Sequence, residues 1–186
     1  YNQVSGNYIG LDASGAGPMG NRVAGMYLAS GVRFNQIGGA SAGARNVISD
    51  NRWDGISLGG TNVLSNTVIG NYIGTDATGT RSLGNHDNGI ALRDGPQFNR
   101  IGGATASEGN LISGNDRAGV VISGDSTLLN TIRGNTIGLN VAGTGMLSNE
   151  WGIGCWNNAQ QNRIEQNVIA GNRTNGLHLD SCDRMV

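Results

Sequence analysis

The sequence predicts an all-β fold, a right-handed parallel β-helix of about six turns with three short strands in each turn. Three observations predict it: a block that recurs at a fixed interval, columns of asparagine within the block, and short apolar segments that alternate buried with variable residues. Together they describe a coil whose successive turns stack and pair as parallel strands.

A block of residues recurs along the chain. The string VIGNYIGTDATG at 68–79 has near copies at 4–15 and 132–143, so the step is 64 residues both times. Repeats of this kind are typical of solenoids, in which each unit packs only on its neighbours. We predict one domain, 1–186, with double-turn repeats 4–67, 68–131 and 132–186. Because neither end resembles a cap, we expect a fragment of a longer repeat protein or a module that self-associates end to end.

Asparagine columns divide each block into two turns. The first column contains Asn35, Asn66, Asn99, Asn130 and Asn162. The second contains Asn7, Asn46, Asn71, Asn110, Asn135 and Asn167, and the third contains Asn21, Asn51, Asn85, Asn115, Asn149 and Asn172. Asn tolerates positive φ, and a buried Asn amide can donate to the next Asn in its column. We therefore expect these residues to be structural and to form the corners between strands.

The most regular segment of each turn has the period of a β-strand. It reads GMYL, GISL, GIAL, GVVI, GIGC and GLHL, at 25–28, 55–58, 89–92, 119–122, 152–155 and 176–179. Strand side chains alternate between faces, so the second and fourth residues of each tetrapeptide are predicted to face the core. The third residues then form an outward column, which contains Tyr27, Ser57, Ala91, Val121, Gly154 and His178.

The cysteines and phenylalanines are expected to serve the core. Cys155 occupies an inward position otherwise held by Leu or Ile, so we predict a small buried hydrophobe. Cys182 lies three residues beyond Leu179, the counterpart of Cys155 one turn on, and this offset argues against a disulfide unless the terminus folds back. Phe34 and Phe98, each directly before a column Asn, are predicted to stack inside the coil.

Composition argues against several classes of protein. Gly accounts for 33 of 186 residues and Pro for 2, which fits neither a packed helical protein nor a disordered linker. All 12 basic residues are Arg, yet the formal net charge is only -1, so no electrostatic field gathers polyanions. No apolar run approaches the roughly twenty residues that span a bilayer. We therefore predict neither nucleic-acid binding nor membrane insertion.

The pattern N-x-I-x-G-N-x-I followed by N-x-x-x-G-I-x-L resembles the repeats of the pectate-lyase-like β-helix superfamily. The likeness is greatest to long repetitive bacterial surface proteins with GNYIGTDATGT-type blocks, and it covers essentially the whole chain. Relatives in that superfamily include polysaccharide lyases, glycoside hydrolases, epimerases, tailspikes and adhesins, so the resemblance does not select one activity. It implies an extracellular or cell-surface location.

If the chain is an enzyme, Asp54, Asp87 and Arg93 are the predicted catalytic residues. Related enzymes place carboxylates and an Arg or Lys along such a face, beside a groove for an extended sugar chain. Neighbouring turns lie roughly 4.8 Å apart. Asp54 and Asp87 can therefore reach the carboxyl separation of about 5–9 Å that glycoside hydrolysis uses. The structural alternative is that these Asp residues cap turns and that Arg93 forms an ion pair with Asp94 or a neighbouring turn.

Exposed aromatic residues point towards ligand recognition. Trp53, Trp151 and Trp156 lie at or beside the third strand, where an exposed indole is a natural platform for a sugar ring. With Tyr27 and His178 of the outward column, they are the predicted ligand-binding residues. The alternative for Trp53 and Trp151 is that each covers a corner of the coil.

No metal site and no cofactor are predicted. His86 and His178 are far apart in the stack, which argues against a His pair. Asp12, Asp76 and Asn140 of the long loops raise the possibility of calcium, but they recur only every second turn and have few acidic neighbours, so turn-forming side chains explain them better. The Gly-rich strings lack the helix and Lys of a phosphate-binding loop.

The function predicted from the sequence is a non-catalytic extracellular scaffold or adhesion module that contacts polysaccharide. The alternative is a polysaccharide lyase or glycoside hydrolase acting on an extended glycan along the third-strand face. The absence of Lys and of a dense carboxylate cluster argues against the enzyme, so that question stays open with a preference for no activity. Ice binding would need a regular array of Thr, which the outward columns lack.

Overall fold

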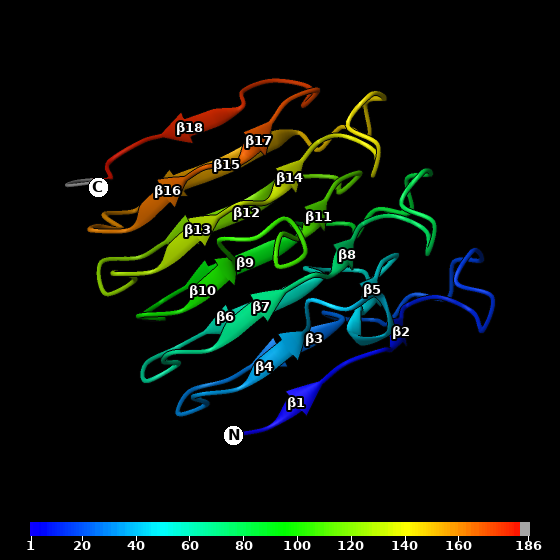
Figure 1. Cartoon of the computed structure of the whole chain (residues 1–186). Coiled ribbons are helices and arrows are strands. Elements are labelled where there is room, and N and C mark those ends of the chain that lie inside the picture. Colours follow the sequence, from blue (N-terminus) through cyan, green and yellow to red (C-terminus); the bar gives the residue numbers. More distant parts are fainter. Residues whose placement is uncertain (183–186) are drawn as a thin grey trace.

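The chain winds into a coil of parallel strands, in which each turn lies on the one before it (Figure 1). The structure is a computed structural model that describes residues 1–182. The last four residues of the predicted third repeat, 183–186, lie outside the described residues. The strands form three six-stranded parallel sheets, so the predicted stack of about six turns with three strands per turn is confirmed.

Each turn contributes one strand to each sheet. The first sheet contains β1 (Gln3–Val4), β4 (Gln36–Gly38), β7 (Thr67–Ile69), β10 (Arg100–Gly102), β13 (Thr131–Arg133) and β16 (Arg163–Glu165). The second contains β2 (Tyr8–Ile9), β5 (Val47–Ile48), β8 (Tyr72–Ile73), β11 (Leu111–Ile112), β14 (Thr136–Ile137) and β17 (Val168–Ile169). The third contains β3 (Met26–Leu28), β6 (Ile56–Gly59), β9 (Ile90–Arg93), β12 (Ala118–Ser123), β15 (Trp151–Trp156) and β18 (Leu177–Leu179).

Helical structure contributes almost nothing to the fold. The 3-10 turn η1 (Ala42–Ala44) is the single helical segment among residues 1–182. No helix in this part of the chain has the length and apolar character needed to cross a membrane.

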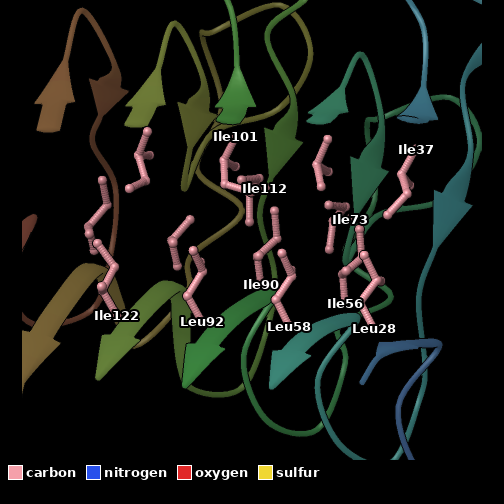
Figure 2. Packing of buried hydrophobic residues seen from close by; sticks show 14 of the residues in the cluster. Leu28, Ile37, Ile56, Leu58, Ile73, Ile90, Leu92, Ile101, Ile112 and Ile122 are labelled. Carbon is pink, nitrogen blue, oxygen red and sulfur yellow. The ribbon is translucent and has the colours of Figure 1, made fainter. Parts of the chain in front are cut away.

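The core is a column of branched aliphatic side chains that runs along the coil axis. Figure 2 shows Ile and Leu residues from all three sheets pointing towards one another between the strands. On β6, β9 and β12 the second and fourth residues of the predicted tetrapeptides are fully buried, as expected from the strand period. Ile dominates because a β-branched side chain packs well on a pleated surface.

Asparagine side chains form three hydrogen-bonded ladders along the corners. In every column the Nδ2 of one Asn donates to the Oδ1 of the Asn one turn later, at 2.8 to 3.0 Å. In most cases the same Oδ1 also accepts the backbone N–H of the earlier Asn, as Asn99 does from Asn66 at 2.9 Å. Because buried amides need partners, each ladder satisfies polar groups that would otherwise destabilise the core. The predicted structural role of the Asn columns is confirmed.

In the first ladder the positive φ of the corner belongs to the residue before each Asn from Asn35 to Asn162, not to the Asn itself. Phe34, Ser65, Phe98, Leu129 and Gln161 take φ values of 55 to 59° directly before the first ladder. This conformation directs the side chain outward, and Phe34 and Phe98 are therefore 57% and 53% exposed. The prediction that both phenylalanines stack inside the coil is wrong, because the corner conformation turns their Cβ atoms away from the core.

A disulfide joins Cys155 to Cys182, with the two Cα atoms 6.1 Å apart. Cys155 is fully buried in the core as predicted, but the expectation against a disulfide is wrong. After β18 the chain bends at Ser181, which has φ 53°, as it does at Gly124 and Asn157 in the matching position of earlier turns, and Cys182 then packs against the core. Asn158 donates its N–H to the Ser181 carbonyl at 2.8 Å, which ties this bend to the preceding turn.

The long loops are closed by acidic or amide side chains that accept backbone N–H groups. The Asp12 Oδ1 accepts the N–H groups of Ser14 and Gly17 at 3.0 and 3.1 Å. Hydrogen bonds from Ser14 and then from Gly17 lower the pKa of the Asp12 carboxyl. Asp76 and Asn140 accept N–H groups of their own loops in the same way. The turn-forming role predicted for these residues is confirmed.

Candidate functional site

The candidate site lies on the outer face of the third sheet, which the strand register places in one continuous row. Across the sheet, Tyr27 pairs with Ser57, Ser57 with Ala91, Ala91 with Val121, Val121 with Gly154 and Gly154 with His178. This is the outward column that the sequence predicts. Ala91 and Val121 have no exposed surface, because the rings of Trp151 and Trp156 pack over them.

A charged cluster occupies the middle of this face. Arg93, the last residue of β9, donates from one terminal nitrogen to Asp54 at 2.7 Å, and its other terminal nitrogen lies 3.8 Å from Asp87. Arg117, on the next turn, lies 3.7 Å from the other side of Asp87. The side chain of Asp54 is only 4% exposed, whereas that of Arg117 is 60% exposed. The cluster thus has a buried acidic end and an exposed basic end.

Asn88 fixes the distance between the two carboxylates. Its Nδ2 donates to Asp54 at 2.9 Å and to Asp87 at 2.9 Å. The two acceptor oxygens therefore lie at most about 6 Å apart, twice that bond length, which is compatible with the short end of the carboxyl separations of about 5–9 Å used in glycoside hydrolysis. The Oδ1 of Asn88 accepts the N–H of Ala118 at 3.1 Å, so the bridging amide is itself held by the next turn.

The environment of Asp87 raises the pKa of its carboxyl. Burial raises the pKa of this carboxyl, and the negative charge of Asp54 raises it further. The charges of Arg93 and Arg117 oppose this effect without reversing it. A carboxyl with a raised pKa beside a second, ionised carboxylate is the arrangement in which one acid can donate a proton.

Tyr27 and Trp53 stand at one end of the cluster. Both side chains are exposed, by 67% and 57%, and they line a hollow of about 540 Å³ together with Asp54 and Arg93. The Tyr27 ring fits over β6 because residue 59 is glycine, where a Cβ would press against the phenol. Trp53 extends from the corner before β6, one position ahead of Asp54.

Trp151, Trp156 and His178 stand at the other end. The indole centroids are 5.9 Å apart in an edge-to-face arrangement, and the His178 ring lies 6.0 and 6.4 Å from them. Gly154 permits this packing, because a Cβ there would enter the Trp156 ring. The three rings line a hollow of about 330 Å³ with Arg93, Arg117 and Asp180.

Arg93 lines both hollows, so both border the charged cluster. We call the combined surface the third-sheet groove: its lining includes Tyr27, Trp53, Asp54, Arg93, Arg117, Trp151, Trp156 and His178. It crosses successive turns with aromatic rings at both ends and paired charges in the middle. Such a shape can hold an extended chain of rings with polar edges.

The structure places all eight predicted catalytic and ligand-binding residues on one face of the coil, from Tyr27 on β3 to His178 on β18. Asp87 contacts the groove residues Arg93 and Arg117. Sequence reasoning missed Asn88 and Arg117. Arg117 was detectable, because it follows Trp53 and Asp87 in the column two residues before each strand glycine: Val23, Trp53, Asp87, Arg117, Glu150 and Thr174. By contrast, His86 contacts Asp116 at 3.1 Å, and neither residue lines the groove.

The fold and the site define a parallel β-helix protein with an aromatic and charged groove along one sheet. Comparison of the chain with models of protein families, with curated proteins and with solved structures gave no match. Among residues 1–182, no three His, Cys, Asp or Glu side chains form a group that could hold a metal ion.

Proposed function

We propose that this chain is a non-catalytic module of an extracellular β-helix protein and that it binds an extended polysaccharide along the third-sheet groove. The observation that carries the proposal is the pair of exposed rings, Tyr27 and Trp53, in the same hollow as Asp54 and Arg93. Aromatic faces suit the C–H faces of sugar rings, and charged groups beside them suit the hydroxyls. A neutral glycan fits better than an acidic one, because the acids of the groove outnumber its two arginines. These acids are Asp54, Asp87, Asp94 and Asp180, and the arginines are Arg93 and Arg117.

The state of Asp54 supports binding without catalysis. Its carboxylate is buried and already engaged by Arg93 and Asn88, at 2.7 and 2.9 Å. A catalytic base or nucleophile must reach the substrate. The oxygens of Asp54 are hydrogen-bonded to other side chains of the protein, so the main role of Asp54 is to position Arg93.

The alternative is a glycoside hydrolase or lyase that uses Asp87, Asp54 and Arg93. Two observations favour it: the short separation of the carboxylates across Asn88, and the raised pKa of Asp87. In a hydrolase Asp87 would donate a proton to the leaving oxygen, and Asp54 would face the sugar as its ionised partner. This role requires Arg93 to release Asp54 when substrate binds.

The disulfide supports the extracellular location. Disulfides persist in oxidising compartments, and Cys155–Cys182 closes the last turn of the coil. Together with the resemblance of the repeats to pectate-lyase-like and bacterial surface β-helices, this favours a secreted or surface-attached protein.

The proposal is tested by incubating the chain with a panel of neutral and acidic polysaccharides, with and without calcium. We expect co-sedimentation with at least one neutral glycan and no new chain ends. The matched variant is Asp87→Asn, which keeps the shape of the side chain and its contact with Asn88. New chain ends made by the wild type but not by Asp87→Asn would contradict the non-catalytic function and establish the enzyme.

A further inference from the structure

A second hollow lies over the second sheet, away from the third-sheet groove. The corner between the first and second sheets carries an inserted loop only in every second turn, at 38–46 and 102–110, whereas the turn between them bends tightly at Gly70. The two loops meet over this glycine, since a Cβ there would press on the backbone carbonyls of Gly39 and Ser107. They enclose a hollow of about 240 Å³. The alternating insertion that produces the 64-residue period therefore also produces this space.

Arg45 is a cation in this hollow whose hydrogen-bonding capacity is unused. Its guanidinium carbon lies 3.9 Å from the centroid of the Tyr72 ring, which fixes the side chain by a cation–π contact. Its Nε is buried and, among residues 1–182, has no hydrogen-bond partner. The guanidinium likewise forms no ion pair in this part of the chain. Buried donors are normally satisfied, so the unpartnered Nε marks Arg45 as a cation for which this part of the chain supplies no polar partner.

The lining of the hollow has no negative charge to balance Arg45. Besides Arg45, its polar side chains are the hydroxyls of Ser41, Tyr72, Ser107 and Thr136 and the amide of Asn110, and no Asp or Glu contributes. When the two inserted loops are aligned, Glu108 of the second loop occupies the position of Ala44, next to Arg45, in the first. The Glu108 carboxylate accepts hydrogen bonds from Thr105 and Arg100, which lower the pKa of Glu108 to about 2. Glu108 therefore interacts within its own loop and strand and does not pair with Arg45.

We propose that Arg45 binds an oxyanion, a sulfate or phosphate group, in this hollow, with Ser41, Ser107 and Thr136 as additional donors. A guanidinium presents several N–H groups in one plane and matches such oxygens closely. Hydroxyl donors complete the coordination without adding charge. The group is either a free ion or an ester on a larger molecule such as a sugar. This site is independent of the third-sheet groove and of its proposed ligand.

Titration calorimetry at constant ionic strength tests the site, with inorganic sulfate, inorganic phosphate, a monosaccharide sulfate and the same sugar without sulfate as probes. We expect the wild type to bind the anionic probes and not the plain sugar. Arg45→Gln should raise the Kd by about tenfold or more, because hydrogen bonds to a charged partner are lost. The control Arg33→Gln removes an exposed arginine outside the hollow and should leave the Kd unchanged.

A second variant guards against misfolding. Arg45→Lys keeps the charge but loses the planar fork, and it should bind more weakly than wild type and more tightly than Arg45→Gln. Tighter binding of the sugar sulfate than of inorganic sulfate identifies an ester as the ligand, whereas equal or weaker binding identifies the free ion. Wild type that binds none of the anions, or equal Kd values for wild type and Arg45→Gln, would overturn the proposal.

Discussion

Replacing Asn99 by alanine is expected to lower the free energy of unfolding by about 3–5 kcal/mol, measured by urea denaturation. Asn99 is buried in the middle of the first ladder. Its Oδ1 accepts both the N–H and the Nδ2 of Asn66, at 2.9 and 3.0 Å. Its Nδ2 donates to Asn130 at 3.0 Å and to the Val63 carbonyl at 2.9 Å. Alanine removes all four of these bonds from a place that water does not reach, and it leaves the Asn66 N–H without a partner. The Asn66 Nδ2, the Asn130 Oδ1 and the Val63 carbonyl each keep one other hydrogen bond.

The matched control for Asn99 is Asn2→Ala, at the start of the same ladder. Asn2 is exposed and donates only to Asn35, at 3.0 Å from its backbone and 2.8 Å from its side chain. We expect its replacement to cost less than about 1 kcal/mol, because water replaces the lost partner. Equal losses for the two variants would show that the ladder does not stabilise the interior of the coil.

Removing the disulfide by Cys182→Ser is expected to cost about 3 kcal/mol. The two cysteines are 27 residues apart, and closing a loop of that length restricts the unfolded chain by an amount of this order. Because each turn of a solenoid contacts only its neighbours, the loss should fall on the last turn. Hydrogen exchange of β17 and β18 should therefore accelerate, while exchange in β8 and β9 stays as in the wild type.

Chemical reduction of the wild type provides the comparison for Cys182→Ser, since it opens the same bond without changing a side chain. Both treatments should destabilise the last turn by similar amounts. Unchanged exchange in β18 after complete reduction would show that the Asp180 N–H bond to the Cys155 carbonyl, at 2.9 Å, and the other backbone hydrogen bonds hold this turn without the disulfide.

The architecture could be predicted because residues that contact one another in a solenoid recur at a regular interval in the sequence. Asn66, Asn99 and Asn130 occupy the same position in successive turns, so residues that align in the repeats stack as a hydrogen-bonded ladder in the structure. The outward row from Tyr27 to His178 followed from strand alternation for the same reason. The alternating loop insertions could also be recognised in the sequence. The hollow that they form around Arg45 became apparent only in the structure.

Features that depend on local conformation could not be predicted with the same means. The disulfide depends on how the chain packs after β18: Ser181 takes positive φ, as Asn157 does at the matching position one turn earlier, and Cys182 then lies against the core, with its Cα 6.1 Å from that of Cys155. The side chains of Phe34 and Phe98 point outward because both residues have positive φ. A bulky aromatic residue rarely adopts positive φ, so the residue type alone does not predict this conformation. The bridge from Asn88 to both carboxylates depends on side-chain rotamers, and spacing along the chain does not report them.

The central claim, that the third-sheet groove binds a glycan, is tested most directly by the affinity of Trp53→Ala for an oligosaccharide of the polysaccharide that the wild type retains. Trp53 is 57% exposed, so its removal should leave the core intact. The control is Phe98→Ala, an aromatic residue of similar exposure, 53%, that does not line the groove. We predict a Kd at least about tenfold higher for Trp53→Ala and unchanged for Phe98→Ala, in line with the loss of an aromatic contact to the ligand. The same Kd for Trp53→Ala and wild type would contradict the account.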